Sequence, residues 1–145
     1  MNVEIKVINK SNNELPHYAT AGAAGMDIRA NIDEIIVLEP LQRMLIPTGI
    51  YLEIPEGYEV QVRPRSGLAL KNGLTCLNSP GTIDSDYRGQ IHVLLINLSN
   101  EAQTINHNDR IAQLVVAKYE TATLTLVTEL NETVRAAGGF GHTGV

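Results

Sequence analysis

The sequence is poor in several residue types, and each shortage removes a class of protein. It contains a single cysteine, Cys76, so no internal disulfide can form, and its neighbours Leu74 and Leu77 predict a small buried side chain. No apolar run approaches the length of a transmembrane helix, and the first residues lack the pattern of a signal peptide. We therefore expect a cytoplasmic protein that makes no membrane contact.

Basic residues are also scarce. Lys and Arg number 11 against 16 Asp and Glu, which leaves a formal net charge of -5 at pH 7. A protein that binds a nucleic-acid polymer usually presents a basic face, so we expect no such partner, whereas a small phosphorylated ligand is compatible with this charge. The four histidines, His17, His92, His107 and His142, lack the spacing of zinc ligands.

Long amphipathic helices are missing as well. No stretch keeps an apolar stripe at helical spacing for more than two turns, whereas β-branched residues recur in short runs between Gly, Pro, Asn and Asp. Such runs predict strands at residues 3–7, 34–38, 41–46, 50–54, 58–62, 91–98, 110–117 and 121–127. For a single domain of 145 residues this pattern indicates an all-β antiparallel sandwich or jelly roll.

Local signals add detail to this fold. Residues 55–57, Pro-Glu-Gly, predict a tight hairpin turn, and residues 66–71 predict one short helix with Ser66 as N-cap and Gly73 as its C-terminal stop. Residues 91–96 and 111–116 are apolar on both faces. We expect part of that surface to be buried against other subunits of an oligomer.

The most informative stretch is residues 81–90, Gly-Thr-Ile-Asp-Ser-Asp-Tyr-Arg-Gly-Gln, which precedes the apolar run 91–96. Turn-forming residues on a buried strand predict a rigid platform with a polar loop that carries Asp84, Asp86, Tyr87 and Arg88. Loops on stiff scaffolds often hold functional groups, but a polar turn is also a common structural feature. Both interpretations stay open on this stretch alone.

The glycine-rich tail, residues 135–144, has two interpretations too. It is either a frayed terminus or a segment that orders around a ligand. Phe140 is the only phenylalanine of the chain, and a ring among glycines needs a surface on which to pack. Arg135, His142, Thr143 and the backbone N–H groups are suitable donors for phosphate.

Three further positions fit an anionic ligand. Arg65, Ser66 and Gly67 at the start of the short helix form either an anion site or a simple cap. Asp27 either binds a hydrated metal ion or pairs with Arg29, and Gln113 in an apolar run either makes a structural hydrogen bond or holds a water. No Walker loop is present, so these groups suggest a nucleotide polyphosphate bound outside the P-loop folds.

The chain resembles a known family at this point. Residues 21–30, 64–69, 78–90, 110–114 and 135–144 are similar, in this order, to the five motifs of the trimeric dUTP pyrophosphatases, or dUTPases. The resemblance implies a jelly-roll domain of the dUTPase-like β-clip kind over residues 1–134 and a flexible closing tail over 135–145. It also implies a homotrimer with shared active sites, which hydrolyses dUTP to dUMP and pyrophosphate with Mg²⁺ by water attack on the α-phosphate.

The resemblance also implies roles for individual residues. Asp84 resembles the carboxylate that activates the attacking water, Gln113 its orienting partner, and Asp27 an outer-shell group that meets Mg²⁺ through water. Tyr87 resembles the residue whose ring excludes a ribose 2′-hydroxyl. The remaining substrate contacts that the resemblance implies are Arg65, Ser66 and Gly67 at the phosphates, Asn78, Gly81, Thr82 and Ile83 at uracil, His92 near the substrate, and Arg135, Gly139, Phe140, Gly141, His142 and Thr143 in the closing tail.

The tail departs from the family pattern at two positions. Ala136 follows Arg135 where glycine is frequent, and His142 replaces a serine before Thr143.

Two rival functions stay open. A dCTP deaminase of the same fold would need an acid/base glutamate in the hairpin region, but none lies between Glu59 and Glu101. A non-catalytic protein that responds to dUTP would have almost the same binding residues.

Overall fold

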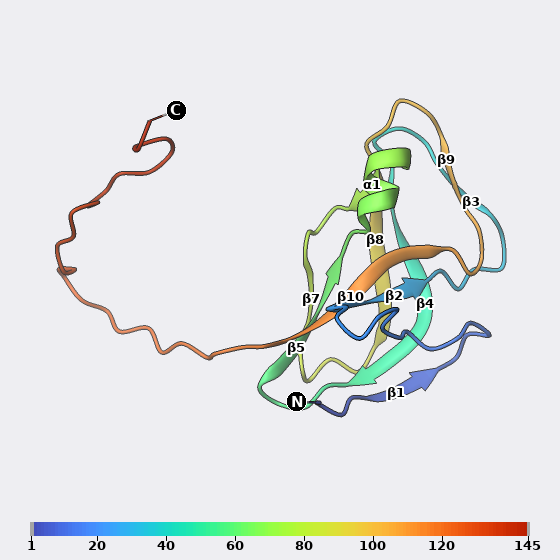
Figure 1. The fold of residues 1–145 in the computed structure, drawn as a ribbon, viewed down its shortest axis with the longest axis horizontal. Helices are drawn as coiled ribbons and strands as arrows, with labels where there is room; N and C mark the ends of the chain where they lie inside the picture. The colour runs from blue at the N-terminus through green and yellow to red at the C-terminus, as the bar shows by residue number, and fades with distance from the viewer. Residues whose placement is uncertain (1, 145) are drawn as a thin grey trace.

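The chain forms a sandwich of two antiparallel sheets with an extended C-terminal tail (Figure 1). This computed structural model describes residues 2–144, so residues 1 and 145, the ends of the predicted ranges 1–134 and 135–145, lie outside it. The first sheet has the order β1-β4-β8-β6, and its strands are Lys6–Asn9, Arg43–Glu53, Gln90–Asn97 and Leu74–Cys76. The second has the order β2-β10-β5-β7, with Gly25–Arg29, Arg110–Lys118, Tyr58–Arg63 and Gly81–Ile83.

A two-stranded ribbon of β3 (Ile36–Leu38) and β9 (Gln103–Ile105), and the helix α1 (Ser66–Asn72), complete the body. The prediction of an all-β sandwich with one short helix is confirmed. Among residues 2–144 we find no helix with both the length and the apolar character needed to cross a membrane.

Alternating side chains build the core between the two sheets. In β8, Ile91, Val93 and Leu95 are at most 3% exposed, and in β10 Ala112 and Leu114 are equally buried. Side chains two residues apart in a strand share a face, so each strand contributes one apolar row to the interior. The alternate residues of these strands point away from this core, towards the outer faces of the sheets.

Two predictions about β4 and β5 are wrong. The runs predicted at 41–46 and 50–54 fall largely in one strand, β4 (Arg43–Glu53), which passes through Pro47 with a shift of register before Tyr51. The turn at 55–57 exists, since Tyr58 N–H donates to Pro55 O at 3.2 Å, but it joins strands of different sheets. It is therefore a connection across the sandwich and not a hairpin, because the strands on either side pair with other neighbours.

The helix α1 begins as predicted but is capped differently. Arg65 occupies the N-cap position, with an extended backbone (φ -92°, ψ 130°) and no capping hydrogen bond from its side chain, so Ser66 is the first helical residue. The prediction of Ser66 as N-cap is wrong, because the last residue with an extended backbone before the helix is Arg65. Gly73 ends the helix as predicted, in the left-handed conformation (φ 65°) with its N–H donating to Leu68 O.

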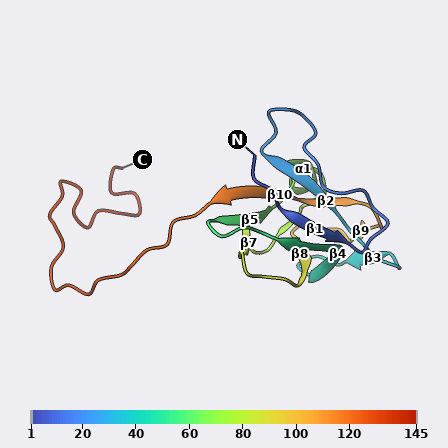
Figure 2. The same cartoon turned by 90° about the horizontal axis from the view of Figure 1, so that it is seen from below.

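The tail begins after β10 and runs away from the body (Figures 1 and 2). Residues 119–144 contain neither helix nor strand, so the strand predicted at 121–127 is absent from this single chain. Leu124 and Leu126 there are 94% and 99% exposed. No neighbouring strand of the described chain lies alongside these residues, and a strand is stable only when its backbone groups and apolar face are paired.

Candidate active site

Polar side chains form a row on the outer face of the second sheet. Gln113 of β10 lies opposite Asp27 of β2 on one side and opposite Arg63 of β5 on the other. Residues that lie opposite each other point to the same face of a sheet, and Ala112 and Leu114 on either side of Gln113 fill the core. Asp27, Gln113 and Arg63 therefore face outwards together.

Asp27 is held between two guanidinium groups. Its Oδ1 accepts a hydrogen bond from Arg65 Nε at 3.0 Å, and its Oδ2 lies 3.5 Å from Arg110 Nη1. The alternative that Asp27 pairs with Arg29 is wrong, since Arg29 binds Glu14 and Asn108 O. The Asp27 side chain is one-third exposed, so these ion pairs add little stability and mainly orient the two arginines.

The site offers few ligands for a metal ion. No group of three or more His, Cys, Asp or Glu side chains within residues 2–144 is arranged to hold one. Asp27 is the carboxylate beside the arginines, and both of its oxygens are already in ion pairs. Mg²⁺ prefers oxygen ligands and keeps several waters, so this donor set fits a hydrated ion held chiefly by substrate phosphates.

The start of α1 adds the predicted phosphate-binding residues to this row. Arg65 is half-buried, and its Nη1 also donates to Arg110 O at 3.4 Å. Ser66 and Gly67 are exposed on the first turn of the helix. Gln113 Nε2 donates to Pro64 O at 3.1 Å, directly before this segment. The structure thus brings Arg65, Gln113 and Asp27 together.

The loop that carries Asp84 lies elsewhere on the body. It connects β7 of the second sheet to β8 of the first, so the two strands beside it do not pair with each other. Asp84 is exposed, and its carbonyl oxygen accepts from Tyr87 N–H at 3.1 Å. A cavity of about 780 Å³ opens here, lined by Ile54, Glu56, Glu59, Asp84, Ser85, Asp86, Arg88 and Tyr119.

Tyr87 is fixed within this loop. Its hydroxyl donates to Gln90 O at 2.8 Å, and a Cβ at Gly89 would lie only 2.4 Å from that hydroxyl, so the ring sits directly beside a glycine. A ring fixed at its hydroxyl has little freedom to move aside for a ligand. The predicted exclusion of a 2′-hydroxyl requires such a ring.

The predicted uracil-binding residues are Asn78 and the three residues of β7, Gly81, Thr82 and Ile83. A Cβ at Gly81 would lie 3.2 Å from Asn78 Nδ2, so the two residues are in close contact. Thr82 is exposed, whereas the Ile83 side chain packs against the core. Among these, Ile83 can therefore offer a ligand only its backbone.

Asp84 and Gln113 do not meet within one chain. Ile83 lies opposite Val60, which lies opposite Val116. Asp84 is therefore about four residues along the sheet and two strands across from Gln113, a separation of roughly 16 Å. A base and an orienting amide must both reach one water molecule, so these two residues can share a substrate only if they come from different copies.

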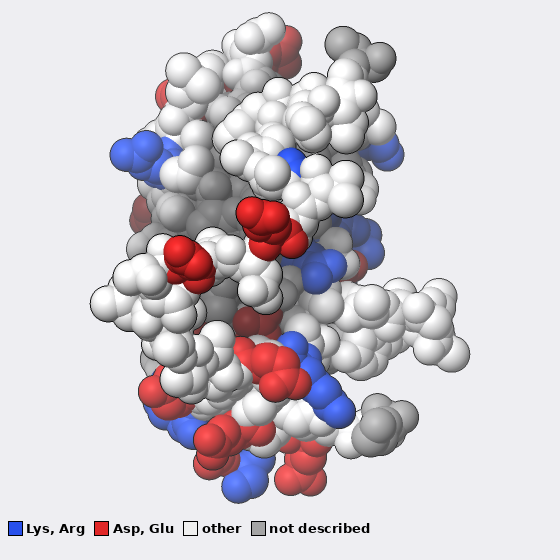
Figure 3. Space-filling view, turned by 90° about the vertical axis from the view of Figure 1, so that its left-hand side faces the viewer, with Lys and Arg blue, Asp and Glu red and all other residues white. Residues whose placement is uncertain are grey.

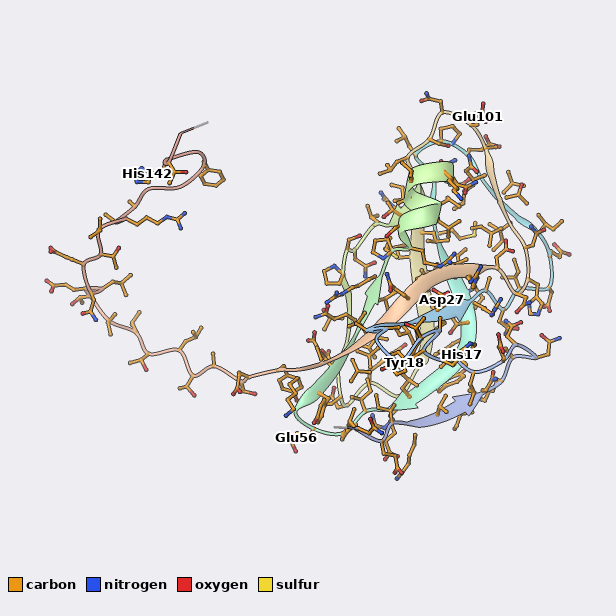
Figure 4. The ribbon with its side chains drawn as sticks, viewed as in Figure 1. His17, Tyr18, Asp27, Glu56, Glu101 and His142 are labelled. Atoms are coloured by element: carbon orange, nitrogen blue, oxygen red, sulfur yellow. The ribbon has the colours of Figure 1, made fainter. Side chains whose placement is uncertain are left out.

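His92 and the tail are also apart from the row. His92 lies opposite Pro47 on the outer face of the first sheet, with Nδ1 3.2 Å from Gln90 O. In the tail Phe140 is fully exposed, and His142 lies far from Asp27 on β2 (Figure 4). The predicted tail contacts, Arg135, Gly139, Phe140, Gly141, His142 and Thr143, are therefore not brought to the site in a single chain.

Arg110 belongs to the site but was not predicted as a site residue. The available signal was a basic residue at the start of the strand that carries Gln113. Strict alternation would put Arg110 on the face opposite Gln113, and the shift of register between Arg110 and Ala112 brings it to the same outward face. Viewed from the side on which the tail lies, the visible acidic and basic side chains are intermixed without a continuous basic area (Figure 3).

Known proteins resemble this chain closely. A family model described as dUTPase matches residues 11–144. The deoxyuridine 5'-triphosphate nucleotidohydrolase of Cytophaga hutchinsonii is 62% identical over 99% of this chain and 94% of its own. That of Finegoldia magna is 58% identical over 98% of this chain and 99% of its own.

A solved structure of the Staphylococcus bacteriophage 80alpha dUTPase with dUpNHpp has a TM-score of 0.85 at 27% identity, covering 99% of this chain and 100% of that one. The match therefore extends along the whole body and most of the tail. The chain belongs to the dUTPase family.

Proposed function

We propose that this chain hydrolyses dUTP to dUMP and pyrophosphate. The observation that carries the proposal is the 62% identity, over 99% of the chain, to a protein named for that reaction. Arg65, Arg110 and Gln113 also support the proposal. The two arginines provide cations for a polyphosphate, and Gln113 provides an amide for a water. A deaminase has no such support, since no glutamate lies between Glu59 and Glu101.

The proposed reaction is attack of water on the α-phosphorus. Asp84 accepts one proton of the water while the water oxygen bonds to the α-phosphorus. The bond from the α-phosphorus to the oxygen that bridges the α- and β-phosphates breaks, and pyrophosphate leaves with the electron pair. Gln113 orients the water through Oε1. Arg65 and Arg110, oriented by Asp27, bind the anionic phosphates.

Members of the family generally use Mg²⁺. We propose that the phosphates hold the ion and that Asp27 contacts its water shell, in agreement with the single carboxylate at this place. When bound, Mg²⁺ neutralises part of the phosphate charge.

We propose that the loop at 78–87 selects the base and sugar. Backbone groups beside Gly81 and Ile83 would pair with uracil O4 and N3, a pattern that cytosine reverses. Each unpaired buried group would cost roughly 1–3 kcal/mol. The ring of Tyr87, fixed by its bond to Gln90 O, would pack on deoxyribose and exclude a 2′-hydroxyl.

We further propose a homotrimer with active sites shared between copies. The separation of Asp84 from Gln113 supports sharing, because one chain cannot complete a site. The outer face of the first sheet supports association. It exposes apolar side chains, with Leu45 58% and Leu77 44% exposed, beside the partly buried Leu94. The number of copies rests on the resemblance to the trimeric dUTPases.

An open apolar groove supports an exchange of tails between the copies. It has a volume of about 670 Å³ and is lined by Val3, Ile5, Val7, Leu15, Tyr18, Met26, Ile50, Leu52, Val60, Leu114, Val116 and other residues. In residues 121–127, Ala122, Leu124 and Leu126 alternate with threonines, which suits one apolar and one polar face. We propose that this segment of a second copy fills the groove and that residues 135–145 then close over a site.

Turnover tests the proposed activity directly. Purified protein with Mg²⁺ should release pyrophosphate from dUTP and far less from dCTP, dTTP or UTP. No turnover would favour a non-catalytic, nucleotide-responsive protein, and equal turnover of all four nucleotides would reject the proposed selection of uracil and deoxyribose.

Light scattering coupled to size-exclusion chromatography tests the assembly. The native chain should elute at three times the mass of 15.8 kDa. Replacing Leu124 and Leu126 by Asp should weaken the trimer, because two exposed leucines would no longer be buried. The matched control replaces Thr123 and Thr125 by Asp on the opposite face, and equal behaviour of the two pairs would reject the groove as the docking site.

A further inference from the structure

Gly25, at the start of β2, lies against the side chain of Gln113. A Cβ built on Gly25 would be 2.2 Å from Gln113 Oε1, 3.1 Å from Cδ and 3.5 Å from Cβ, and these are its three nearest atoms. The first distance is far shorter than any contact between non-bonded atoms. The backbone of Gly25 does not need glycine for a positive φ, because its φ lies outside the left-handed region.

Glycine is otherwise a poor choice for this position. It loses more conformational freedom than alanine when a strand forms, and in strands it frequently marks a place where another group approaches closely. Here the approaching group is the amide of one side chain. The contact is diagonal, since Gly25 lies opposite Val115 and Gln113 lies opposite Asp27.

The orientation of the Gln113 amide follows from its other contact. Pro64 O accepts a hydrogen bond at 3.1 Å, and a carbonyl oxygen can only accept, so the nitrogen of the amide faces Pro64. The oxygen Oε1 must then face Gly25. Gln113 is thereby held in one orientation between the start of α1 and the start of β2.

Oε1 is free to accept a further hydrogen bond. It accepts none of the side-chain hydrogen bonds found among residues 2–144. Since no buried side-chain nitrogen or oxygen in that range lacks a partner, Oε1 keeps some contact with solvent. A methyl group on Gly25 would occupy the space directly beside this oxygen.

We propose that Gly25 is a positioning residue for hydrolysis, because its missing side chain lets Gln113 present Oε1 to the attacking water. The proposal rests on the function proposed above for Gln113. Gly25 acts through Gln113 and touches no reacting atom. An added methyl group would turn the amide away from Pro64, so the attacking water would lose Oε1 as its acceptor. The phosphate-binding arginines would keep their ion pairs with Asp27.

A double-mutant cycle on the full-length protein tests this link. The variants are Gly25→Ala, Gln113→Ala and the double variant, each assayed for kcat and KM with dUTP and Mg²⁺ and for the Kd of dUpNHpp. We expect Gly25→Ala and Gln113→Ala each to lower kcat by about 10²-fold, the loss typical of a misplaced catalytic group. KM and the Kd of dUpNHpp should change by less than about threefold, because the nucleotide contacts are unchanged.

The double variant gives the decisive result. With alanine at 113, the Oε1 and Cδ contacts disappear and only Cβ remains, at an ordinary distance of 3.5 Å. We therefore expect the double variant to be no slower than Gln113→Ala alone. Gly22→Ala is the matched control, since a Cβ there meets nothing within 4 Å, and it should keep the native rate.

Each other outcome has a defined meaning. Native turnover of Gly25→Ala, or a double variant slower than Gln113→Ala by the full factor of Gly25→Ala, would overturn the proposal. Native turnover of Gln113→Ala would reject the role of Gln113 itself, a failure of the proposed mechanism that is separate from the steric link.

Thermal unfolding covers the case in which Gly25→Ala fails to fold. If the double variant then recovers the Tm of Gln113→Ala, the contact with Gln113 is the cause and the proposal is supported. If Gly25→Ala and the double variant both fail to fold, Gly25 is needed for another reason and the proposal is wrong.

Discussion

Strand β10 and residues 121–127 follow each other closely in the chain, and both carry apolar residues at every second position, yet only β10 is a strand. β10 is hydrogen-bonded to β2 on one edge and β5 on the other, and its Ala112 and Leu114 are completely buried. In 121–127, Leu124 and Leu126 are almost fully exposed. Alternation supplies a surface that a sheet can bury, but the sheet itself decides whether a strand forms.

The same difference separates the roles of body and tail. The body holds its polar groups in fixed places, as the bonds of Asp27 to Arg65 and of Gln113 to Pro64 illustrate. After Tyr119, whose N–H donates to Gly57 O at 3.1 Å, the described part of the tail has only local turns, such as Gly138 N–H to Arg135 O and His142 N–H to Gly139 O. A rigid body suits chemistry, and a tail with few contacts suits closure over a ligand, so the comparison can be tested by changing each part separately.

The largest effect is expected from the base in the body. Asp84→Asn should lower turnover of dUTP by about 10²- to 10⁴-fold, because a positioned general base is lost, while the Kd of dUpNHpp stays similar. Asp86→Asn, two residues away in the same loop, is the control and should keep most of the turnover. Steady-state pyrophosphate release measures both, and equal losses would show that Asp84 has no special role.

Core packing should separate the two regions next. Leu95→Ala removes a completely buried side chain of β8 and should lower the free energy of unfolding by about 2–5 kcal/mol. Leu130→Ala in the tail, where the side chain is 87% exposed, should change it by less than about 0.5 kcal/mol. Urea denaturation at one protein concentration compares them, and a similar loss for both would mean that Leu130 is buried in the assembly.

Deletion of residues 135–145 should affect catalysis and leave the body intact. Loss of the Arg135 donor and of the closing glycine segment should lower kcat/KM by about 10²-fold, as for other phosphate-stabilising groups. The Tm should stay within a few degrees, because residues 135–144 extend away from the core. An unchanged rate would show that the tail is not a lid.

The smallest effect is expected at Cys76. Burial raises the pKa of this thiol to about 11, so at pH 8 very little reactive thiolate is present. A thiol reagent should label the native protein slowly and the urea-unfolded protein rapidly, and labelling after unfolding is the internal control. Rapid labelling of the native protein would place Cys76 outside the core.

Much of the fold could be predicted because its signals are local. The alternating runs placed β5, β8 and β10 within one residue of their observed ends, and Gly73 ended the helix as expected. Short strands such as β6 and β7 were missed, since three residues carry too little pattern. The turn at 55–57 was found, but its strands were assigned to one hairpin because nothing local reveals which sheet each strand joins.

Candidate site residues were found by residue type, and their partners were not. For Asp27, the protein partner considered from the sequence was Arg29, two residues away, as the alternative to a hydrated metal ion. In the structure Asp27 binds Arg65 and Arg110, which are distant in sequence. Gly25 carries no functional signal in the sequence alone. Its meaning depends on the side chain that lies against it across β2 and β10.

The family, the two-sheet architecture and the available chemical groups follow from the residues along the chain, because periodicity and motifs depend on near neighbours. The positions of Gln113 beside Gly25 and Pro64, and of Asp84 too far from Gln113 to share a water within one copy, follow from the folded arrangement. The physical reason is strand register. It is set by non-local pairing and core packing, and a shift of one residue would turn every outward side chain of β10 inwards.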